Sequence, residues 1–162
     1  MGPGLIEVWM LYYPIFLKGL VGTLKYAAIA VFFGTLLGCF IAILHLSKNK
    51  IINAIAVVYV NVLRGTPLLV QMYIAYFCLP MAFPVMNALS KEQYVILSLI
   101  LNSSAYVSEI IRGGITSVDK GQTEAARSLG MISRNCMMQI IMPQAVKNIL
   151  PSLANEYIAM IK

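Results

Sequence analysis

An apolar stretch from Tyr26 to Leu46 constrains this chain more than any other feature of its sequence. The stretch contains no Asp, Glu, Lys or Arg, and Lys48 and Lys50 follow it directly. A helix of this length crosses the roughly 30 Å hydrocarbon core of a bilayer, and basic residues gather at the cytoplasmic ends of such helices. We therefore predict a membrane span over about residues 24–46.

The composition is that of a membrane protein. Of the 162 residues, 60% are hydrophobic and 11% are charged, whereas soluble domains are about one quarter charged. The net charge of +6 comes from basic residues beside apolar segments, so we expect membrane lipid as a partner and no nucleic acid. The three cysteines lack metal-ligand spacing and predict neither a disulfide framework nor a metal site.

The segment before this span, residues 5–20, is apolar and rich in aromatic side chains such as Trp9 and Tyr12. Aromatic residues concentrate at membrane interfaces, so we predict a short interfacial helix. Pro14 lacks the backbone N–H of a helix interior, which argues against a longer unbroken helix.

The segment after it, Ile51 to Leu63, is apolar but too short to cross a membrane. It predicts a short helix on the cytoplasmic surface, ending at Arg64-Gly65-Thr66-Pro67. Thr66 is a favourable N-cap and Pro67 suits the first helical position. We therefore predict a break here, followed by a span over residues 67–80.

Two further spans are expected. Ser90 and Gln93 form a capping box at the start of a span over residues 91–112. Residues 145–162 begin a fourth span, which Pro151 interrupts, and the sequence stops within it, so we expect either a truncated product or a sequence that does not include the rest of the chain. The predicted fold class is an all-α membrane protein, a multi-span helical bundle forming one domain over residues 1–162.

The distribution of lysine and arginine sets the orientation. Basic residues flank the loop at 47–50 and the loop at 119–143, whereas the loop between the second and third spans has only Lys91, next to Glu92. The positive-inside rule places the first two loops in the cytoplasm and the N-terminus outside.

The stretch from Gly121 to Pro143 is polar although it lies between apolar segments. It predicts two short helices joined by a hinge. Thr123 caps the first helix, and Gly130 takes a positive φ just past its end. Ser133 caps the second helix, which Pro143 interrupts.

The first of these two helices has a face suited to docking. Ala125, Ala126 and Leu129 lie on one side at helical spacing, and Glu124 complements the positive end of the helix dipole. Adjacent alanines on an exposed face allow another surface to approach closely. This pattern predicts a helix that docks into a groove of another protein.

A family resemblance follows from these residues. Glu124-Ala125-Ala126, three residues, Gly130, nine residues, Ile140, one residue and Met142-Pro143 resembles the EAA loop of ATP-binding-cassette (ABC) importer permeases. Three other stretches resemble the branch that imports polar amino acids: Arg64 to Gln71, Ala105 to Gly114, and Asn155 to Ile158. The resemblance covers most of the chain.

The resemblance implies a permease subunit of an ATP-driven importer in the bacterial cytoplasmic (inner) membrane. Its partners would be an ABC ATPase subunit, a second permease subunit, identical or homologous, and an extracytoplasmic amino-acid-binding protein. ATP and Mg would bind to the ATPase, so we expect no cofactor on this chain. The residues implied to couple to the ATPase are Gly121, Gln122, Glu124, Ala125, Ala126, Leu129 and Gly130.

Polar residues within predicted spans are functional candidates. We assign Gln71, Asn102 and Glu156 to the substrate path. Hydrogen bonding between helices explains Gln71 and Asn102 equally well, whereas an acid in a span needs a partner or a role. The remaining motif residues are expected to be structural, with Arg64 anchoring the inner interface or pairing nearby: Arg64, Gly65, Thr66, Pro67 and Pro143.

We expect no catalytic activity from this chain alone. It has no nucleotide-binding motif and no carboxylate pair suited to hydrolysis, and its one histidine, His45, belongs to no credible Ser-His-acid or Cys-His arrangement. Two alternatives to an importer subunit stay open. One is a passive channel subunit, against which the EAA loop argues, and the other is a truncated permease fragment that packs without transporting.

Overall fold

The computed structural model describes residues 4–161, and this part of the chain is almost entirely helical, without a β-strand. The all-α class predicted from the sequence is therefore confirmed. The elements are α1 (Leu5–His45), α2 (Lys50–Gly65), α3 (Leu68–Tyr73), the π-helical η1 (Ile74–Cys78), α4 (Leu79–Ala82), the 3-10 helix η2 (Pro84–Ala88), α5 (Lys91–Thr116), α6 (Lys120–Ser128), α7 (Ser133–Asn135), the π-helical η3 (Cys136–Ile141) and α8 (Met142–Ile161).

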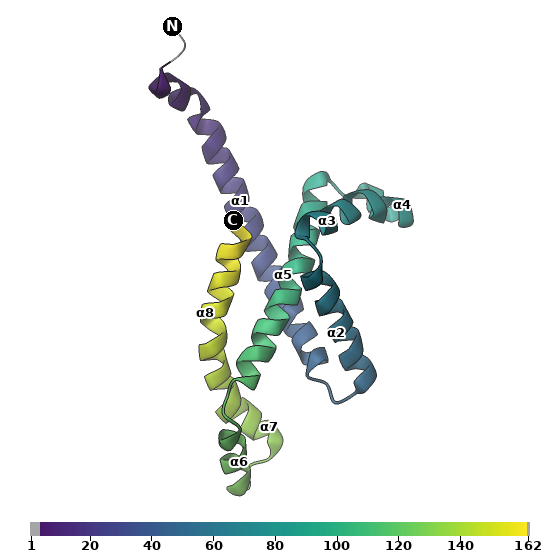
Figure 1. Cartoon of the computed structure of the whole chain (residues 1–162), viewed down its shortest axis with the longest axis vertical. Helices are drawn as coiled ribbons and strands as arrows, with labels where there is room; N and C mark the ends of the chain where they lie inside the picture. The colour runs from purple at the N-terminus through teal and green to yellow at the C-terminus, as the bar shows by residue number, and fades with distance from the viewer. Residues whose placement is uncertain (1–3, 162) are drawn as a thin grey trace.

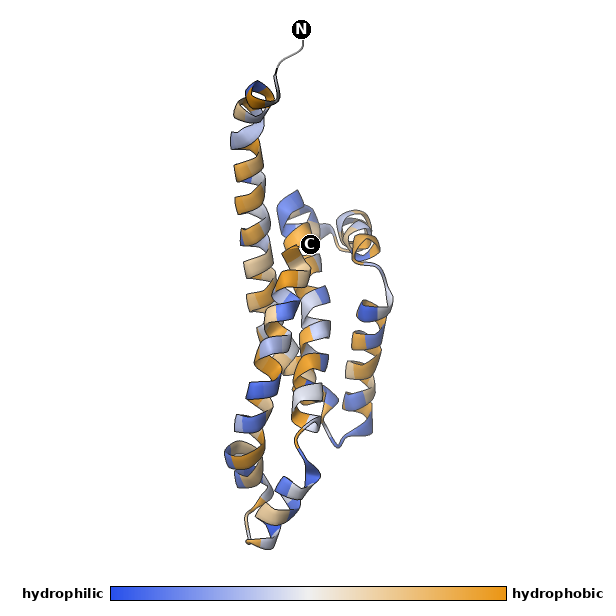
Figure 2. Cartoon of the chain, turned by 60° about the vertical axis from the view of Figure 1, so that its left-hand side comes forward, coloured by the Kyte–Doolittle hydropathy of each residue, from blue (hydrophilic) through white to orange (hydrophobic). Residues whose placement is uncertain are grey.

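Helix α5 is the centre of the bundle. It contacts α1, α2, α3, η1 and α8, and its contact with α1 is the most extensive (Figure 1). Helices α2 and α8 run along opposite sides of α5, and α6 and α7 project beyond it at one end. Figure 2 shows apolar residues along most of α1, with hydrophilic residues more frequent around α6 and at the start of α2.

Two glycines bring α1 close to α5. A Cβ atom added to Gly34 would lie 2.8 Å from the Ser103 side chain, and one added to Gly38 would lie 2.8 Å from Val107 Cβ. Ser103 and Val107 are fully buried at this contact. Small residues at a helix interface allow the two backbones to approach, so the glycines serve packing within one chain.

Helix α1 is longer than the sequence predicted. It runs without a break from Leu5 to His45 through Pro14, so the prediction of a separate short helix over residues 5–20 is wrong. A proline removes one backbone hydrogen bond, and long apolar helices tolerate this because the neighbouring turns keep theirs. The first part of α1 exposes large apolar side chains, such as Trp9 and Phe16.

Helix α2 is packed into the bundle, so the prediction of a helix on the surface is wrong. It contacts α1 and α5 and buries Ala56 and Val60 against Ile41. The chain then bends by 106° into the helical stretch Leu68–Ala82. By length and composition α1 and α5 are able to cross a membrane, and the bent pair counts as a third crossing if taken as one unit.

The bend lies where the sequence predicted a break, but the predicted caps are shifted. Thr66 follows the last residue of α2, and Pro67 precedes the first residue of α3. The Thr66 hydroxyl donates to the Val62 carbonyl of α2 at 2.8 Å. Thr66 therefore belongs to the end of α2 and does not cap the helix that follows.

The start of α5 confirms the predicted capping box. The Gln93 N–H donates to Ser90 Oγ at 3.3 Å, and the Ser90 N–H donates to Gln93 Oε1 at 2.7 Å. Further along α5, Gly114 lies directly against the Ile149 side chain of α8. The missing side chain at Gly114 thus permits close packing of α5 on α8.

Prolines do not interrupt the last helical region, contrary to the prediction. Pro143 is the second residue of α8, directly after η3, and Pro151 lies inside α8. The π-helical turns of η3 pair each residue with one five positions along, and this wider spacing accommodates a residue without an N–H. The predicted cap at Ser133 is also wrong, because Ile132 holds that position without a side-chain bond.

Candidate functional site

The residues of the EAA motif form a compact unit at one end of the molecule (Figure 1). Helix α6 begins at Lys120, and Asp119 Oδ1 accepts a hydrogen bond from the Gly121 N–H at 2.6 Å. The prediction that Thr123 caps this helix is wrong. Asp119 satisfies the free N–H groups one turn earlier, which leaves Thr123 inside the helix.

The end of α6 is as predicted. Gly130 has a φ of 82°, in the left-handed region that favours glycine. Its N–H donates to the Arg127 carbonyl at 2.9 Å, and the Met131 N–H donates to the Ala126 carbonyl at 3.1 Å. These are the two bonds of a Schellman motif, which turns the chain sharply out of α6.

The two alanines of the motif differ in burial, so the prediction that both are exposed is wrong. Ala126 is 4% exposed and packs in a buried cluster with Cys136 and Ile141. Ala125 is exposed, and Leu129, four residues later on the same face, is 85% exposed. The remaining predicted coupling residues within α6 are also exposed: Gly121, Gln122 and Glu124.

A pocket of about 320 Å³ lies between α5, α8 and the first residue of α3. Two of the predicted path residues, Asn102 and Glu156, line it, and Glu156 is 9% exposed. The other lining residues are Leu68, Tyr106, Ala159 and Met160. A buried carboxylate and an amide in an apolar pocket suit a small solute with a cationic group.

The third predicted path residue, Gln71, lines a neighbouring cavity of about 290 Å³ and not this pocket. It is joined to the pocket by hydrogen bonding, because Asn102 Nδ2 donates to Gln71 Oε1 at 3.1 Å. Gln71 Nε2 donates to the Leu63 carbonyl at 2.7 Å and to the Thr66 hydroxyl at 2.8 Å. Gln71 thus connects the bend between α2 and α3 to the amide of Asn102.

An ionic cluster, made of His45, Arg64, Glu109 and Arg112, lies next to the pocket. Arg112 donates two hydrogen bonds to the Glu109 carboxylate, at 2.9 and 2.8 Å. Arg64 Nη1 lies 3.6 Å from Glu109 Oε2, and His45 Nδ1 lies 3.3 Å from Oε1 without hydrogen-bond alignment. The cluster joins α1, α2 and α5, and it includes the nearby pairing expected for Arg64.

Sequence reasoning missed the four other residues that line the pocket, among them Tyr106 and Leu68. Tyr106 follows Asn102 by four positions on α5, so helical spacing placed it on the same face. Leu68 stands at the start of α3 and carries no polar signal. Tyr106 could have been found from the helical periodicity of α5. Leu68 could be placed in the pocket only by knowing the bend between α2 and α3.

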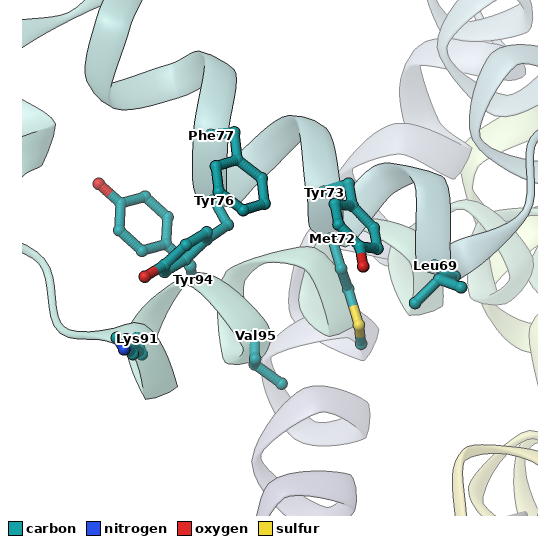
Figure 3. A pocket seen from close by; sticks show the side chains of 8 residues that line it. All are labelled: Leu69, Met72, Tyr73, Tyr76, Phe77, Lys91, Tyr94 and Val95. Atoms are coloured by element: carbon teal, nitrogen blue, oxygen red, sulfur yellow. The ribbon is translucent and has the colours of Figure 1, made fainter.

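A second concavity, of about 330 Å³, lies between α3, η1 and the start of α5 (Figure 3). Its walls are largely aromatic, with the Tyr76 and Tyr94 rings edge to face at 5.8 Å between centroids. None of the predicted path residues lines it. The lining residues are Leu69, Met72, Tyr73, Tyr76, Phe77, Lys91, Tyr94 and Val95.

Metal-ligating side chains are not grouped in this part of the chain. Within residues 4–161, no three His, Cys, Asp or Glu side chains lie together as possible metal ligands. Cys39 and Cys78 are exposed, and Cys136 is buried in the cluster beneath α6.

Relatives in bacteria align with most of this chain. Residues 34–162 match the family described as binding-protein-dependent transport system inner membrane component. One relative is a protein of Rickettsia prowazekii (strain Madrid E) that is named as a glutamine transport system permease protein, GlnP. It is 44% identical to this chain, over 93% of this chain and 70% of its own length. The arginine transport system permease protein ArtQ of Bacillus subtilis (strain 168) is 41% identical over 92% of this chain and 67% of its own length.

A solved structure shares the fold. It is described as the crystal structure of an amino acid ABC transporter with histidines, and it superposes with a TM-score of 0.91 at 46% identity. The match covers 99% of this chain and 73% of the other. The chain therefore belongs to the binding-protein-dependent transport system inner membrane components, among the amino-acid ABC transporter permeases.

Proposed function

We propose that this chain is the permease subunit of an ATP-driven importer that carries a polar amino acid across the bacterial cytoplasmic membrane. The observation that carries the proposal is Glu156, a buried acid that lines a pocket beside Asn102 and Tyr106. A charged side chain at membrane depth costs about 3 kcal/mol or more unless a cation or water accompanies it. The ammonium group of an amino acid supplies such a cation.

The names of the relatives narrow the substrate class. One relative is named for glutamine and another for arginine, and both are polar amino acids. The Asn102 amide, held by Gln71, adds a hydrogen-bonding group beside Glu156. L-glutamine and L-arginine are therefore the first candidates for transport by this chain.

Coupling to ATP hydrolysis is proposed to pass through the EAA loop. Ala125 and Leu129 form an exposed apolar surface on α6 that suits a groove on an ATPase subunit. The adjacent Ala126 is buried and packs in one cluster with Ala145 of α8. Because α8 also carries Glu156, a displacement of α6 reaches the pocket through packed helices.

The same proposal assigns the partners and the orientation. ATP and Mg bind to the ATPase subunit, a second permease subunit completes the membrane path, and an extracytoplasmic binding protein delivers the amino acid. The loop at 47–50 and the EAA loop lie toward the same end of the molecule, which supports a common cytoplasmic side with the N-terminus outside (Figure 1).

Reconstitution into proteoliposomes tests the proposal. The chain is assembled with its ATPase and binding protein, and uptake of labelled L-glutamine and L-arginine is followed with and without ATP on the ATPase side. Accumulation that requires ATP supports an importer. Uptake that is the same with and without ATP contradicts the proposal and favours a passive channel. If the complex is fully recovered but takes up neither amino acid, the proposal is contradicted. That result favours a permease fragment that packs without transporting.

A further inference from the structure

The concavity between α3, η1 and the start of α5 is an open apolar groove, called here the aromatic groove (Figure 3). The residues that α3 and η1 contribute recur at spacings of three and four, so they lie along one side of this helical stretch: Leu69, Met72, Tyr73, Tyr76 and Phe77. The Tyr73 and Phe77 rings stack at 5.7 Å between centroids, and these two residues are 58% and 54% exposed. An apolar groove of about 330 Å³ suits a hydrocarbon chain.

A more polar hollow of about 440 Å³ adjoins the aromatic groove. Tyr76, Lys91 and Tyr94 line both the groove and the hollow, so these three residues form the boundary between the two. Asn87 and Ser90 add an amide and a hydroxyl to the walls of the polar hollow. The combined site therefore changes from apolar to polar at Lys91.

Lys91 supplies a positive charge at this boundary without a carboxylate partner. Neither the groove nor the hollow is lined by Asp or Glu. Within residues 4–161, the ion pairs shorter than 4 Å all involve Glu109, so no carboxylate pairs with Lys91. Glu92 follows Lys91, but consecutive residues of a helix do not face each other. Lys91 is also the only lysine or arginine between Arg64 and Arg112. The boundary therefore attracts an anion.

These features match the parts of a phospholipid. The groove is apolar, the cation lies where the groove meets the polar hollow, and Figure 3 shows Lys91 on the side of the groove away from Leu69. Lys91 is the first residue of α5, a helix able to cross a membrane, so it stands at the level where hydrocarbon meets headgroups. Tyrosine is enriched at that level, and lysine there attracts anionic lipid. We propose that the aromatic groove binds an anionic phospholipid, with an acyl chain between η1 and α5 and the phosphate at Lys91.

Quenching of a tryptophan in the groove by brominated lipid tests the proposal. Trp9 is the only tryptophan of the chain, so Trp9→Phe combined with Phe77→Trp places a single reporter in the groove. The complex of the permease with its ATPase is reconstituted into vesicles of phosphatidylglycerol and phosphatidylcholine, one of which carries bromine on its acyl chains, and the signal of the Trp9→Phe complex is subtracted. Quenching should give a binding constant about fivefold higher for phosphatidylglycerol, as one lysine beside anionic lipid predicts. A matched reporter on the exposed side of α1, Phe33→Trp, should give a ratio near one.

Variants of the groove reporter separate the charge from the groove. Lys91→Gln removes the charge and should lower the ratio to about one, whereas Lys91→Arg keeps the charge and should retain the preference. Val95→Phe fills part of the groove and should also abolish the preference, although Lys91 is still present. Lys120→Gln, the same change at an exposed lysine of α6, should leave the ratio unaltered.

Three results would overturn the inference. The first is equal quenching of the groove reporter by the two lipids, or a preference that survives in Lys91→Gln. The second is a preference that survives in Val95→Phe, since the lysine then attracts anionic lipid without any chain in the groove. The third is a reporter that neither lipid quenches, since protein, such as a second permease subunit, then covers the groove. The measurement involves no transport, so its failure leaves the proposed function unaffected.

Discussion

Gly38 and Val107 leave no room between α1 and α5 for one further carbon atom. A Cβ at Gly38 would lie 2.8 Å from Val107 Cβ and 2.9 Å from the Ser104 carbonyl oxygen. Gly22 lies on the same helix, but a Cβ added there would meet no heavy atom within 4 Å in the described part of the chain, apart from the neighbouring backbone of α1 itself. The two glycines therefore differ in packing alone.

Gly38→Ala should destabilise the folded permease. Overpacking of a close contact costs about 1–3 kcal/mol, because backbone or side chains must shift to admit the methyl group. Thermal unfolding of the purified protein should show a lower midpoint than the wild type. Gly22→Ala is the matched control and should not lower it. Equal midpoints for the two variants would mean that α1 and α5 are not tightly packed at Gly38.

Adjacent alanines in α6 should respond differently to the same substitution. Ala125→Arg places a charge on the exposed face proposed to dock the ATPase, so the permease should be recovered normally while the ATPase no longer co-purifies. Ala126→Arg forces a charge into the buried cluster and should lower recovery of the permease itself, by about 3 kcal/mol or more of stability.

Size-exclusion chromatography and ATPase co-purification measure both effects in one preparation. Lys48→Asp is the control, since it adds an acid to an exposed position outside the EAA loop. Full ATPase recovery with Ala125→Arg would exclude this face of α6 from the docking surface.

The hydrogen bond between Asn102 and Gln71 should make their effects on binding depend on each other. Gln71→Met keeps the length of the side chain and removes its bonds, so Asn102 loses its fixed direction and amino-acid affinity should fall severalfold. In an Asn102→Ala background the same change should have little further effect. Hydrogen bonds between membrane helices couple by about 0.6 kcal/mol on average, and up to about 1.7. Strictly additive effects would show that Gln71 does not act through Asn102.

Single cysteines should report the proposed topology. They are placed at Lys50, Lys91 and Lys120 in a background without Cys39, Cys78 and Cys136, and intact cells receive a membrane-impermeant thiol reagent. The positive-inside rule predicts labelling at Lys91 alone. Permeabilised cells control for access to the other two sites. Labelling at Lys120 in intact cells would invert the proposed orientation.

Features governed by a few neighbouring residues were predictable from the sequence. The capping box of Ser90 and Gln93 and the left-handed Gly130 were predicted correctly, because each depends on backbone groups within five positions. Thr66 and Thr123 were assigned wrongly for the same local reason. The Thr66 hydroxyl donates to the Val62 carbonyl and does not cap α3, and Asp119 takes the cap position of α6 in place of Thr123.

Features governed by tertiary packing were not predictable. Proline lowers helix propensity locally, yet α1 and α8 continue through Pro14 and Pro151. Ala125 and Ala126 are identical residues, and only the packing of α6 on its neighbours decides which is buried. Asn102 and Glu156 were each predicted as path residues from the sequence. That both line one pocket depends on how α8 packs against α5, which the sequence alone does not reveal.

Uptake by the Glu156→Gln variant tests the central claim most directly. The substitution keeps the shape of the side chain and removes its charge, so a substrate ammonium group loses its partner. In proteoliposomes carrying the assembled transporter, ATP-driven uptake of labelled L-glutamine or L-arginine should fall by about tenfold or more, as expected for a lost charge-assisted bond. Recovery of the permease with its ATPase should stay unchanged. Full uptake at normal recovery, or loss of assembly in place of uptake, would contradict the assignment of Glu156 to the substrate pocket.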